Sequence, residues 1–516
     1  MTARPAPAGA PRPTARGAVV GVVTLAVALG VAELVAGVVG PASSPLIAVG
    51  GTVVDASPEW LKTFAIRTFG SSDKVVLLIG IAAVLAAIAI ALGMLAWRRP
   101  RLAIGGLLVL GAIGAAAAVA RPGLGVEAAL PSLAGTAAGL VAFLRLREVA
   151  DAGAPAPPTP GGYDRRRFFR TAAAAAGLAA VGGGLGRMLA AREGATESRA
   201  AARIPEPVAP TPAPPADPAL DVPGIAAYRT PNDSFYRVDT ALFVPGVDAA
   251  TWSLRVHGMV DRELTLDYDA LLARPMIERD VTLACVSNEI GGPYVGNATW
   301  IGAPLADLLD EAGVRPGATQ LVSRSVDGFT IGTPTAVVTD GRDAMLAVAM
   351  NGQPLPLEHG FPVRIVVPGL YGYVSATKWL VDLELTTLDA YDAYWIVRGW
   401  AKEAPVKTQS RIDTPKAGAT IGAGTVPVAG VAWAQHRGIE RVEVRVDGGE
   451  WVEARLGLRG SIDTWRQWLY AWDATAGHHV IAVRATDGDG ETQTADRAAP
   501  FPDGATGYHE ISVEVT

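Results

Sequence analysis

The chain has 516 residues, half of them apolar, a formal net charge of −6 at pH 7 and a single cysteine, Cys285. This length exceeds what one hydrophobic core supports, so several domains are expected. The acidic balance provides no basic face for nucleic acid, and one cysteine excludes an intramolecular disulfide, a thiolate-held iron–sulfur cluster and a Cys-x-x-Cys-His haem attachment.

Residues 1–195 are predicted to form a membrane domain. A helix needs about 20 mostly apolar residues to span a bilayer. The segments that meet this requirement are 17–40, 74–97, 102–120, 123–144 and 171–191. Arginines gather before the first, between the second and third, and before the fifth, while the alternate loops hold few basic residues. The positive-inside rule therefore predicts an inner amino terminus and an outer location for everything after residue 195.

The fifth segment opens with the stretch Asp164-Arg-Arg-Arg-Phe-Phe-Arg170. This stretch resembles a twin-arginine export signal, and the resemblance implies that the following domain crosses the membrane folded, commonly with its cofactor loaded. The alternative is a plain positive-inside anchor.

Two carboxylates, Glu33 and Glu127, fall within predicted spans. They are interpreted either as part of a proton or ion path or as polar groups packed near an interface or between helices, and no role is assigned to them. All six histidines follow the membrane segments. A bis-histidine haem between these helices is therefore excluded.

Residues 196–224 are a predicted linker, since "PEPVAPTPAPPADPA" cannot bury a core and forms a semi-stiff spacer. Residues 225–402 show a mixed pattern. Short alternating runs at 252–257, 364–368 and 379–385 predict strands, and 304–312 predicts a short helix that begins at proline. The expected fold of this region is α+β.

Cys285 ends the strand-like run "RDVTLAC" and precedes Gly291 and Gly292. Three interpretations stay open from the residues alone. The thiol is a small buried hydrophobe, or a nucleophile with His359 as its base, or a soft metal ligand to a centre whose other ligands come from a cofactor.

Four segments resemble, in order, the sulfite oxidase family of molybdenum-cofactor enzymes: "SFYRVDTALFVP", "TLACVSN", "NGQPLPLEHGFPVRIVV" and "PGLYGYVSATKWL". The resemblance implies one molybdopterin that holds molybdenum through two dithiolene sulfurs. It also implies that the sulfur of Cys285 is a further metal ligand, beside terminal oxygens.

The resemblance also implies the site residues. His359 and Arg364 are assigned to the phosphate and pyran side of the cofactor, and Ala376, Thr377 and Lys378 close over the pterin. The paired N–H donors of an arginine guanidinium and the compact charge of a lysine ammonium both suit a phosphate group. A histidine that caps the turn before Gly360 and an arginine at the surface are the alternatives. The predicted catalytic residues are Cys285 and Arg237, and the remaining cofactor contacts are Asp233, Tyr236, Arg237, Asn288 and Asp327.

Two positions depart from the pattern of sulfite-oxidising members. Ile290 stands where they have arginine after Cys-x-x-Asn, and Phe329 replaces a tyrosine. An anion pocket normally needs paired cationic donors. An uncharged oxo acceptor, such as a sulfoxide or N-oxide, is therefore favoured over sulfite or nitrate.

Residues 403–516 carry short strands separated by Asp-Gly and Gly-Gly turns, which predict an antiparallel sandwich. This region resembles the immunoglobulin-like domain that follows the molybdenum domain in the same family and often mediates dimerisation there, so a homodimer is one expectation. Trp465, Trp468 and Trp472 are interpreted as core or as interface, with core favoured.

The expected function is two-electron oxygen-atom transfer on a small substrate by a membrane-anchored molybdenum oxidoreductase at the outer face. Electrons then pass to or from a separate protein or the quinone pool, and lipid contacts the amino-terminal helices. The alternatives are a non-catalytic cell-surface binding or assembly protein built on a degenerate molybdopterin domain, and a thiol hydrolase.

Overall fold

The computed structural model describes residues 14–40, 43–58, 61, 64, 68, 73–121, 125–151, 193–211, 220–241 and 244–516. The chain divides into two compact units, Met1–Glu193 and Gly194–Thr516.

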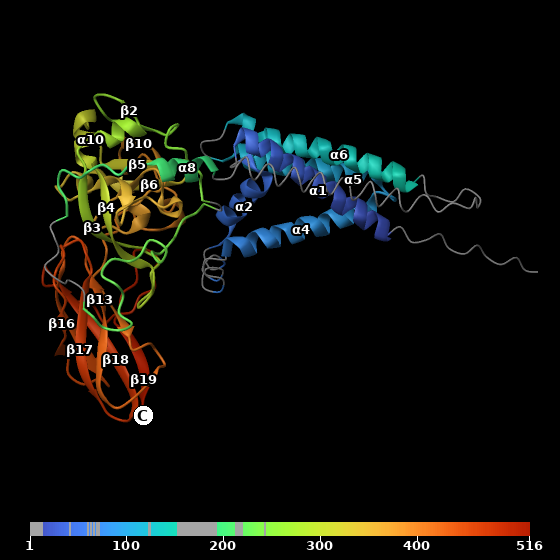
Figure 1. The fold of residues 1–516 in the computed structure, drawn as a ribbon. Helices are drawn as coiled ribbons and strands as arrows, with labels where there is room; N and C mark the ends of the chain where they lie inside the picture. The colour runs from blue at the N-terminus through green and yellow to red at the C-terminus, as the bar shows by residue number, and fades with distance from the viewer. Residues whose placement is uncertain are drawn as a thin grey trace, which may run out of the picture. The chain divides into compact units, whose positions relative to one another are not determined.

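The first unit consists of apolar helices (Figure 1). They are α1 (Thr14–Val39), α2 (Pro45–Ala56), α4 (Asp73–Leu95), α5 (Pro100–Val119), the 3-10 turn η3 (Val126–Ala129) and α6 (Leu130–Asp151). Among the described residues, four helical stretches are long and apolar enough to cross a membrane: Gly17–Val39, Val76–Leu95, Pro100–Val119 and Val126–Glu148. They match the first four predicted segments. The fifth segment, with the twin-arginine-like stretch, lies outside the described residues.

Small residues bring these helices close together. A Cβ on Gly21 of α1 would lie 1.9 Å from the carbonyl oxygen of Ala89 in α4, so only glycine permits this approach. Glu33 has a polar partner here, because the Ser44 hydroxyl at the start of α2 donates to its carboxylate at 2.6 Å. This contact favours the interpretation of Glu33 as a packed polar group.

The second unit begins with an α+β region that contains two sheets. One sheet has the order β3-β4-β7-β8 with β9 paired to β7, and the other has the order β2-β1-β10-β5-β6. The strands of the first are β3 (Ile277–Ala284), β4 (Val295–Pro304), β7 (Met345–Met350), β8 (Gln353–Pro354) and β9 (Arg364–Val366). Those of the second are β1 (Ser253–Gly258), β2 (Leu264–Asp267), β5 (Gln320–Ser325), β6 (Thr330–Pro334) and β10 (Leu380–Thr386).

Short helices precede, connect and follow these strands: α8 (Glu193–Ala201), α9 (Tyr268–Leu272), α10 (Leu305–Ala312), α11 (Thr335–Val338), η4 (Leu357–His359), η5 (Gly372–Val374) and η6 (Ile396–Arg398). The predicted helix at 304–312 is confirmed as α10, which buries its leucines and ends at Gly313 in the left-handed conformation that glycine tolerates. The strands predicted at 252–257, 364–368 and 379–385 correspond to β1, β9 and β10.

The carboxy-terminal region is the predicted all-β sandwich. One sheet has the order β11-β13-β17-β16 and the other β12-β19-β18-β14-β15. The strands are β11 (Gln409–Thr414), β12 (Thr420–Ile421), β13 (Gly424–Trp433), β14 (Ile439–Val446), β15 (Val452–Glu453), β16 (Arg455–Leu456), β17 (Arg466–Ala474), β18 (Gly477–Asp487) and β19 (His509–Val515). Trp468 and Trp472 are buried in the sandwich core, while Trp465 is buried with the core of the α+β region.

Candidate functional site

Cys285 directly follows β3 and opens a ten-residue loop, residues 285–294, that leads into β4; we call it the Cys285 loop. The Cys285 amide donates to the Tyr294 carbonyl at 2.9 Å. The side chain of Asn288 closes the loop from within, because its Oδ1 accepts from the Tyr294 amide at 2.8 Å. Asn288, predicted as a cofactor contact, thus also shapes the loop that presents the cysteine.

Cys285 is half-buried as a residue, unlike the four residues of β3 that precede it, which are buried. Its Sγ lies 2.9 Å from Ser287 Oγ. Burial raises the pKa of the Cys285 thiol, and the hydrogen bond with Ser287 opposes that change. A cation bound at sulfur would favour the thiolate form.

Tyr236 links the cysteine to the basic residues. Its ring stacks on Phe235 at a centroid distance of 5.3 Å and lies 6.4 Å from the ring of Tyr294. Burial raises the pKa of the Tyr236 hydroxyl, the negative charge of Cys285 raises it further, and the Arg364 guanidinium lowers it. Tyr236 is therefore within electrostatic reach of both ends of the site.

Gly372 lies beside Tyr236, close to the end of β3. A Cβ on this glycine would lie 3.7 Å from both the Ala284 carbonyl oxygen and Ala376 Cβ, and 4.0 Å from Tyr236 Oη. Ala376, predicted to contact the pterin, therefore lies near the residue that precedes Cys285.

Arg364 is a buried cation, 5% exposed, in β9. Its guanidinium donates to the His359 carbonyl at 3.2 Å and lies 4.9 Å from the ring centroid of Trp300. Burial lowers the pKa of Arg364 to about 10. No ion pair involves Arg364 among the residues that the structure describes. The surface interpretation of this arginine is wrong, since its side chain lies inside the protein.

His359 is also buried, and it ends the 3-10 turn η4 before Gly360. Its Nε2 lies 3.0 Å from the Asn232 carbonyl oxygen, so this nitrogen carries the proton and Nδ1 is left as an acceptor. Burial, reinforced by the Arg364 charge, lowers the pKa of His359 to about 4. The imidazole is therefore neutral at pH 7.

Lys378 adds a second cation, whose side chain is 11% exposed. Its Nζ donates to Asp239 Oδ2 at 2.8 Å and to the Glu358 carbonyl at 3.3 Å. Burial lowers the pKa of Lys378 to about 8, while Asp239 opposes the change. Arg237 donates to the same Asp239 oxygen at 2.7 Å, although its side chain is 37% exposed. Asp239 thus holds the predicted catalytic arginine beside the lysine.

The other predicted residues lie around this cluster with different surroundings. The Thr377 hydroxyl is buried against Ser323 Oγ at 2.6 Å. Asp327 accepts from the Phe329 amide and forms the turn between β5 and β6, and its neighbour Val326 donates to the Trp379 carbonyl. Asp233 is exposed and accepts from the Ser234 hydroxyl.

Asp239 and Asn232 were not predicted from the sequence. Asp239 lies inside the segment "SFYRVDTALFVP", so an acid close to Tyr236 and Arg237 was the available signal. Asn232 contributes a main-chain carbonyl to His359 and a side-chain oxygen to Asn351 Nδ2 at 2.8 Å. Because every residue has a main-chain carbonyl, a contact of this kind cannot be predicted from the residue type.

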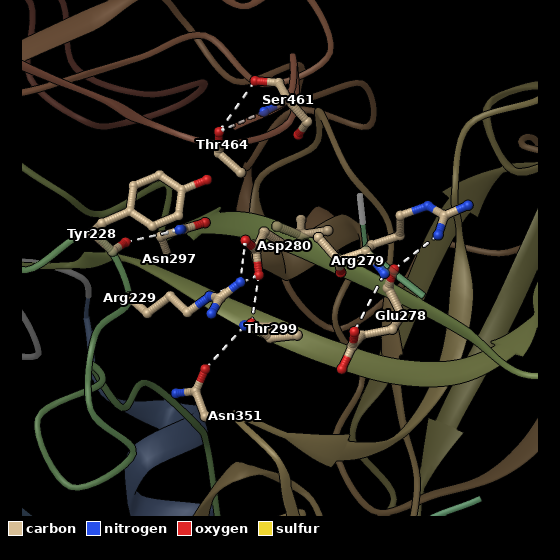
Figure 2. A network of polar contacts seen from close by, with 12 residues as sticks. Tyr228, Arg229, Glu278, Arg279, Asp280, Asn297, Thr299, Asn351, Ser461 and Thr464 are labelled. Atoms are coloured by element: carbon tan, nitrogen blue, oxygen red, sulfur yellow. Dashed lines mark hydrogen bonds and ion pairs between the residues drawn. The ribbon is translucent and has the colours of Figure 1, made fainter. Parts of the chain in front are cut away.

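A polar network joins β3 and β4 to residues 228–229 (Figure 2). Asp280 on β3 accepts both Nε and Nη2 of Arg229, at 3.1 and 2.9 Å, and the Thr299 hydroxyl of β4. Asn297 of β4 donates to the Tyr228 carbonyl at 2.8 Å. These contacts tie the segment that precedes Asn232 to the strand that ends at the cysteine.

Comparison with protein families gives two matches. The oxidoreductase molybdopterin binding domain matches residues 241–395, and a bacterial Ig domain matches residues 409–483. The two matches coincide with the α+β region and with the sandwich.

Curated relatives are similar over about half of the chain. Sulfite oxidase of Gallus gallus is 31% identical over 325 residues, which is 53% of this chain and 70% of that protein. Mitochondrial sulfite oxidase of Homo sapiens is 32% identical over 323 residues, 53% of this chain and 58% of that protein. Nitrate reductase [NADH] 1 of Oryza sativa subsp. japonica is 29% identical over 48% of this chain and 34% of that protein. The chain thus spans little more than half the length of the human relative.

Among solved structures, the sulfane dehydrogenase SoxCD from Paracoccus pantotrophus is similar with a TM-score of 0.50 and 24% sequence identity. The similarity covers 58% of this chain and 82% of that one. At this identity the likeness shows a shared fold.

Proposed function

Because this chain belongs to the sulfite oxidase family of molybdopterin-dependent oxidoreductases, we propose that it catalyses two-electron oxygen-atom transfer on a small substrate at the outer face of a membrane. The family relationship assigns molybdenum with molybdopterin as the cofactor. We further propose that residues 1–195 anchor the enzyme, 196–224 link it, 225–402 carry the catalytic domain and 403–516 the sandwich. Four apolar helices support the anchor.

The residues present fit this cofactor. The observation that carries the proposal is the buried Arg364 guanidinium, which no described carboxylate pairs, beside the neutral His359 and the half-buried Lys378. A buried cation without a counter-ion is costly, and a phosphate group supplies that counter-ion through the forked donors of arginine. The half-buried Cys285 stands at the other end of Tyr236, where a soft metal finds a sulfur ligand.

Cys285 would hold the metal, and Asn288 would fix the loop that presents the sulfur. When bound, the cofactor supplies oxygen-atom and electron-pair transfer, while the protein positions it and excludes competing reactions. Arg364, His359 and Lys378 would bind its phosphate and pyran side. We propose that Asp233, Asp327, Ala376 and Thr377 line the pterin and that Arg237, which Asp239 holds beside Lys378, is a further cofactor contact.

For the substrate we propose an uncharged oxo compound, such as a sulfoxide or N-oxide. Ile290 occupies the position of the expected anion-binding arginine, and its side chain packs against Gly507 of the carboxy-terminal region. Phe329 brings a ring that lies 5.3 Å from that of Tyr394 and has no hydroxyl to donate. Without these donors, a sulfite or nitrate anion loses its paired contacts.

We also propose a separate electron-transfer protein or the quinone pool as the redox partner. With one cysteine, and with every histidine placed after the membrane segments, the chain cannot ligate an iron–sulfur cluster or a haem between its helices. A homodimer through the sandwich is a further proposal, based on the resemblance of that domain.

Elemental analysis of full-length native protein and of the Cys285→Ala variant tests the metal assignment. Molybdenum is expected in the native protein and is expected to be largely lost from the variant, with unchanged circular dichroism. Equal molybdenum in both would exclude thiolate ligation. A panel of sulfoxides, N-oxides, sulfite and nitrate with reduced and oxidised dye then tests the substrate class, and exclusive turnover of the anions would contradict the assignment.

A further inference from the structure

The outer side of the Cys285 loop contacts the carboxy-terminal sandwich through Arg411 of β11. Arg411 Nη1 donates to the Gly292 carbonyl at 3.0 Å. Its Nε donates to Asp413 Oδ1 at 2.7 Å, and Asp413 Oδ2 accepts from the Ala226 amide at 2.9 Å. Both charged side chains are nearly buried, 12% and 7% exposed. The carboxylate therefore fixes the direction in which the guanidinium donates to the loop.

His509 of β19 packs against the adjacent glycine of the same loop. A Cβ on Gly291 would lie 2.3 Å from both Cδ2 and Nε2 of the His509 ring, and Gly291 has a φ of +72°. His509 Nδ1 accepts from the Ile412 amide at 2.9 Å, which fixes the ring orientation. Burial and the Arg411 charge lower the pKa of His509 to about 4, so the ring is neutral at pH 7. Only glycine fits against this ring.

The strand that leads into the loop is held from the same side. β3 is an edge strand of its sheet, so one row of its main-chain groups lacks a strand partner. At Thr282, three residues before the cysteine, the carboxy-terminal region supplies hydrogen-bond partners for the main chain and the side chain. The Thr282 amide donates to the Asp463 carbonyl at 2.9 Å, and Gln435 Nε2 donates to the Thr282 carbonyl at 3.0 Å. The Trp465 amide donates to the Thr282 hydroxyl at 2.7 Å.

We propose that Arg411 and His509 are positioning residues of the reaction centre, which act through Gly292 and Gly291 to fix the Cys285 thiol. The sandwich then has a role in each single chain, independent of dimer formation. The inference deepens the proposed function and rests on it only in so far as Cys285 is the metal ligand.

The test measures how fast iodoacetamide alkylates the cofactor-free, full-length protein in detergent, with adducts counted by intact mass. Cys285 is the only cysteine of the chain, so the rate reports on this thiol alone. The loop variants are Gly291→Ala and the double variant Arg411→Met with Asp413→Asn, which leaves no unpaired carboxylate. Gly448→Ala is the matched control, since Gly448 has a φ of +71° and an added Cβ there meets nothing within 4 Å.

Loss of one charge-assisted hydrogen bond to the loop is expected to raise the alkylation rate about tenfold in the double variant, at a temperature where circular dichroism shows that the variant is still folded. Gly291→Ala is expected to raise the rate similarly, and to add less in a His509→Ala background, because the clash with the ring is then gone and only the strain of the positive φ is left. Gly448→Ala is expected to leave the rate at the native value.

Native rates in both loop variants would overturn the proposal, as would an equal increase in the Gly448→Ala control. If one loop variant fails to fold, the other decides. The assay contains no metal, so it is separate from the molybdenum measurement. Unchanged molybdenum in Cys285→Ala with altered alkylation in the loop variants would overturn the ligand assignment and leave the positioning contact standing.

Discussion

Replacement of Arg364 by methionine tests the cationic end of the site most directly. The pKa of Arg364 falls from its ordinary value of 12.5 to about 10 because the side chain is buried. One pKa unit corresponds to about 1.4 kcal/mol, so the charged form costs about 3 kcal/mol in the folded, cofactor-free protein. Because the pKa of Arg364 is lower in the folded state than in the unfolded chain, the folded protein carries this penalty in full at every pH below about 10.

The cofactor-free Arg364→Met protein is therefore expected to be more stable than the native one, by about 1–3 kcal/mol at pH 7, because an unbranched apolar chain replaces an uncompensated charge. Contacts of the guanidinium with Trp300 and the His359 carbonyl reduce the gain. After growth under cofactor-loading conditions, the variant is expected to retain little molybdenum. The chain would then lose stability relative to the loaded native protein.

Urea unfolding of full-length protein in detergent, followed by tryptophan fluorescence, measures the first effect, and elemental analysis measures the second. Arg441→Met is the control, because this side chain is 46% exposed, and its change should stay within about 0.5 kcal/mol. A cofactor-free Arg364→Met protein that is clearly less stable than the native one would show that the charge is compensated inside the fold. Native molybdenum content in the variant would refute the assignment to the phosphate.

Three further outcomes follow from the same residues. The pKa of His359 is about 4 instead of 6.5, so the unfolded chain takes up the proton first, and the stability of the native protein falls by up to about 3 kcal/mol as the pH drops from 6.5 to 4. The urea midpoint of His359→Gln should fall less than that of the native protein across this range, and parallel curves for the two proteins would argue against a buried neutral imidazole. The pKa of Lys378 is about 8 instead of 10.5, so the native protein should gain stability as the pH rises from 8 toward 10.5, whereas Lys378→Met should show no such gain. Urea midpoints of the two proteins at pH 7.5 and 9.5 measure this difference. Thr282→Val removes the hydroxyl that accepts from the Trp465 amide and donates to Asn297 Oδ1, so the free energy of unfolding is expected to fall by about 1–3 kcal/mol. Calorimetry measures this change, and a value near zero would mean that the two groups find other hydrogen-bond partners.

Local patterns in the sequence were sufficient for several features of the protein. Apolar runs predicted the four described membrane-length helices, and alternation predicted β1, β9 and β10. These features depend on hydropathy and side-chain period within a few neighbouring residues. The four motif segments likewise led to the family and its cofactor, since they occur in order along the chain.

The surroundings of each candidate residue required the tertiary structure. Arg364 could have been a surface charge by its place in an alternating run, but it is buried against Trp300, 64 positions earlier in the numbering of the chain. Asp239 pairs with Lys378 across a separation of 139 residues. Residue type predicts the chemistry that a side chain can offer, whereas its pKa depends on burial and on charges brought near by folding.

By itself, the sequence determined which elements form and which residue types are available for a metal, a phosphate and a substrate, because these properties are local and chemical. Only the tertiary structure decided that the sandwich contacts the Cys285 loop, through Arg411 and Gly292, which are 119 residues apart. Such a contact depends on how two regions of the chain pack, and the free energy of that packing comes from many distant side chains together.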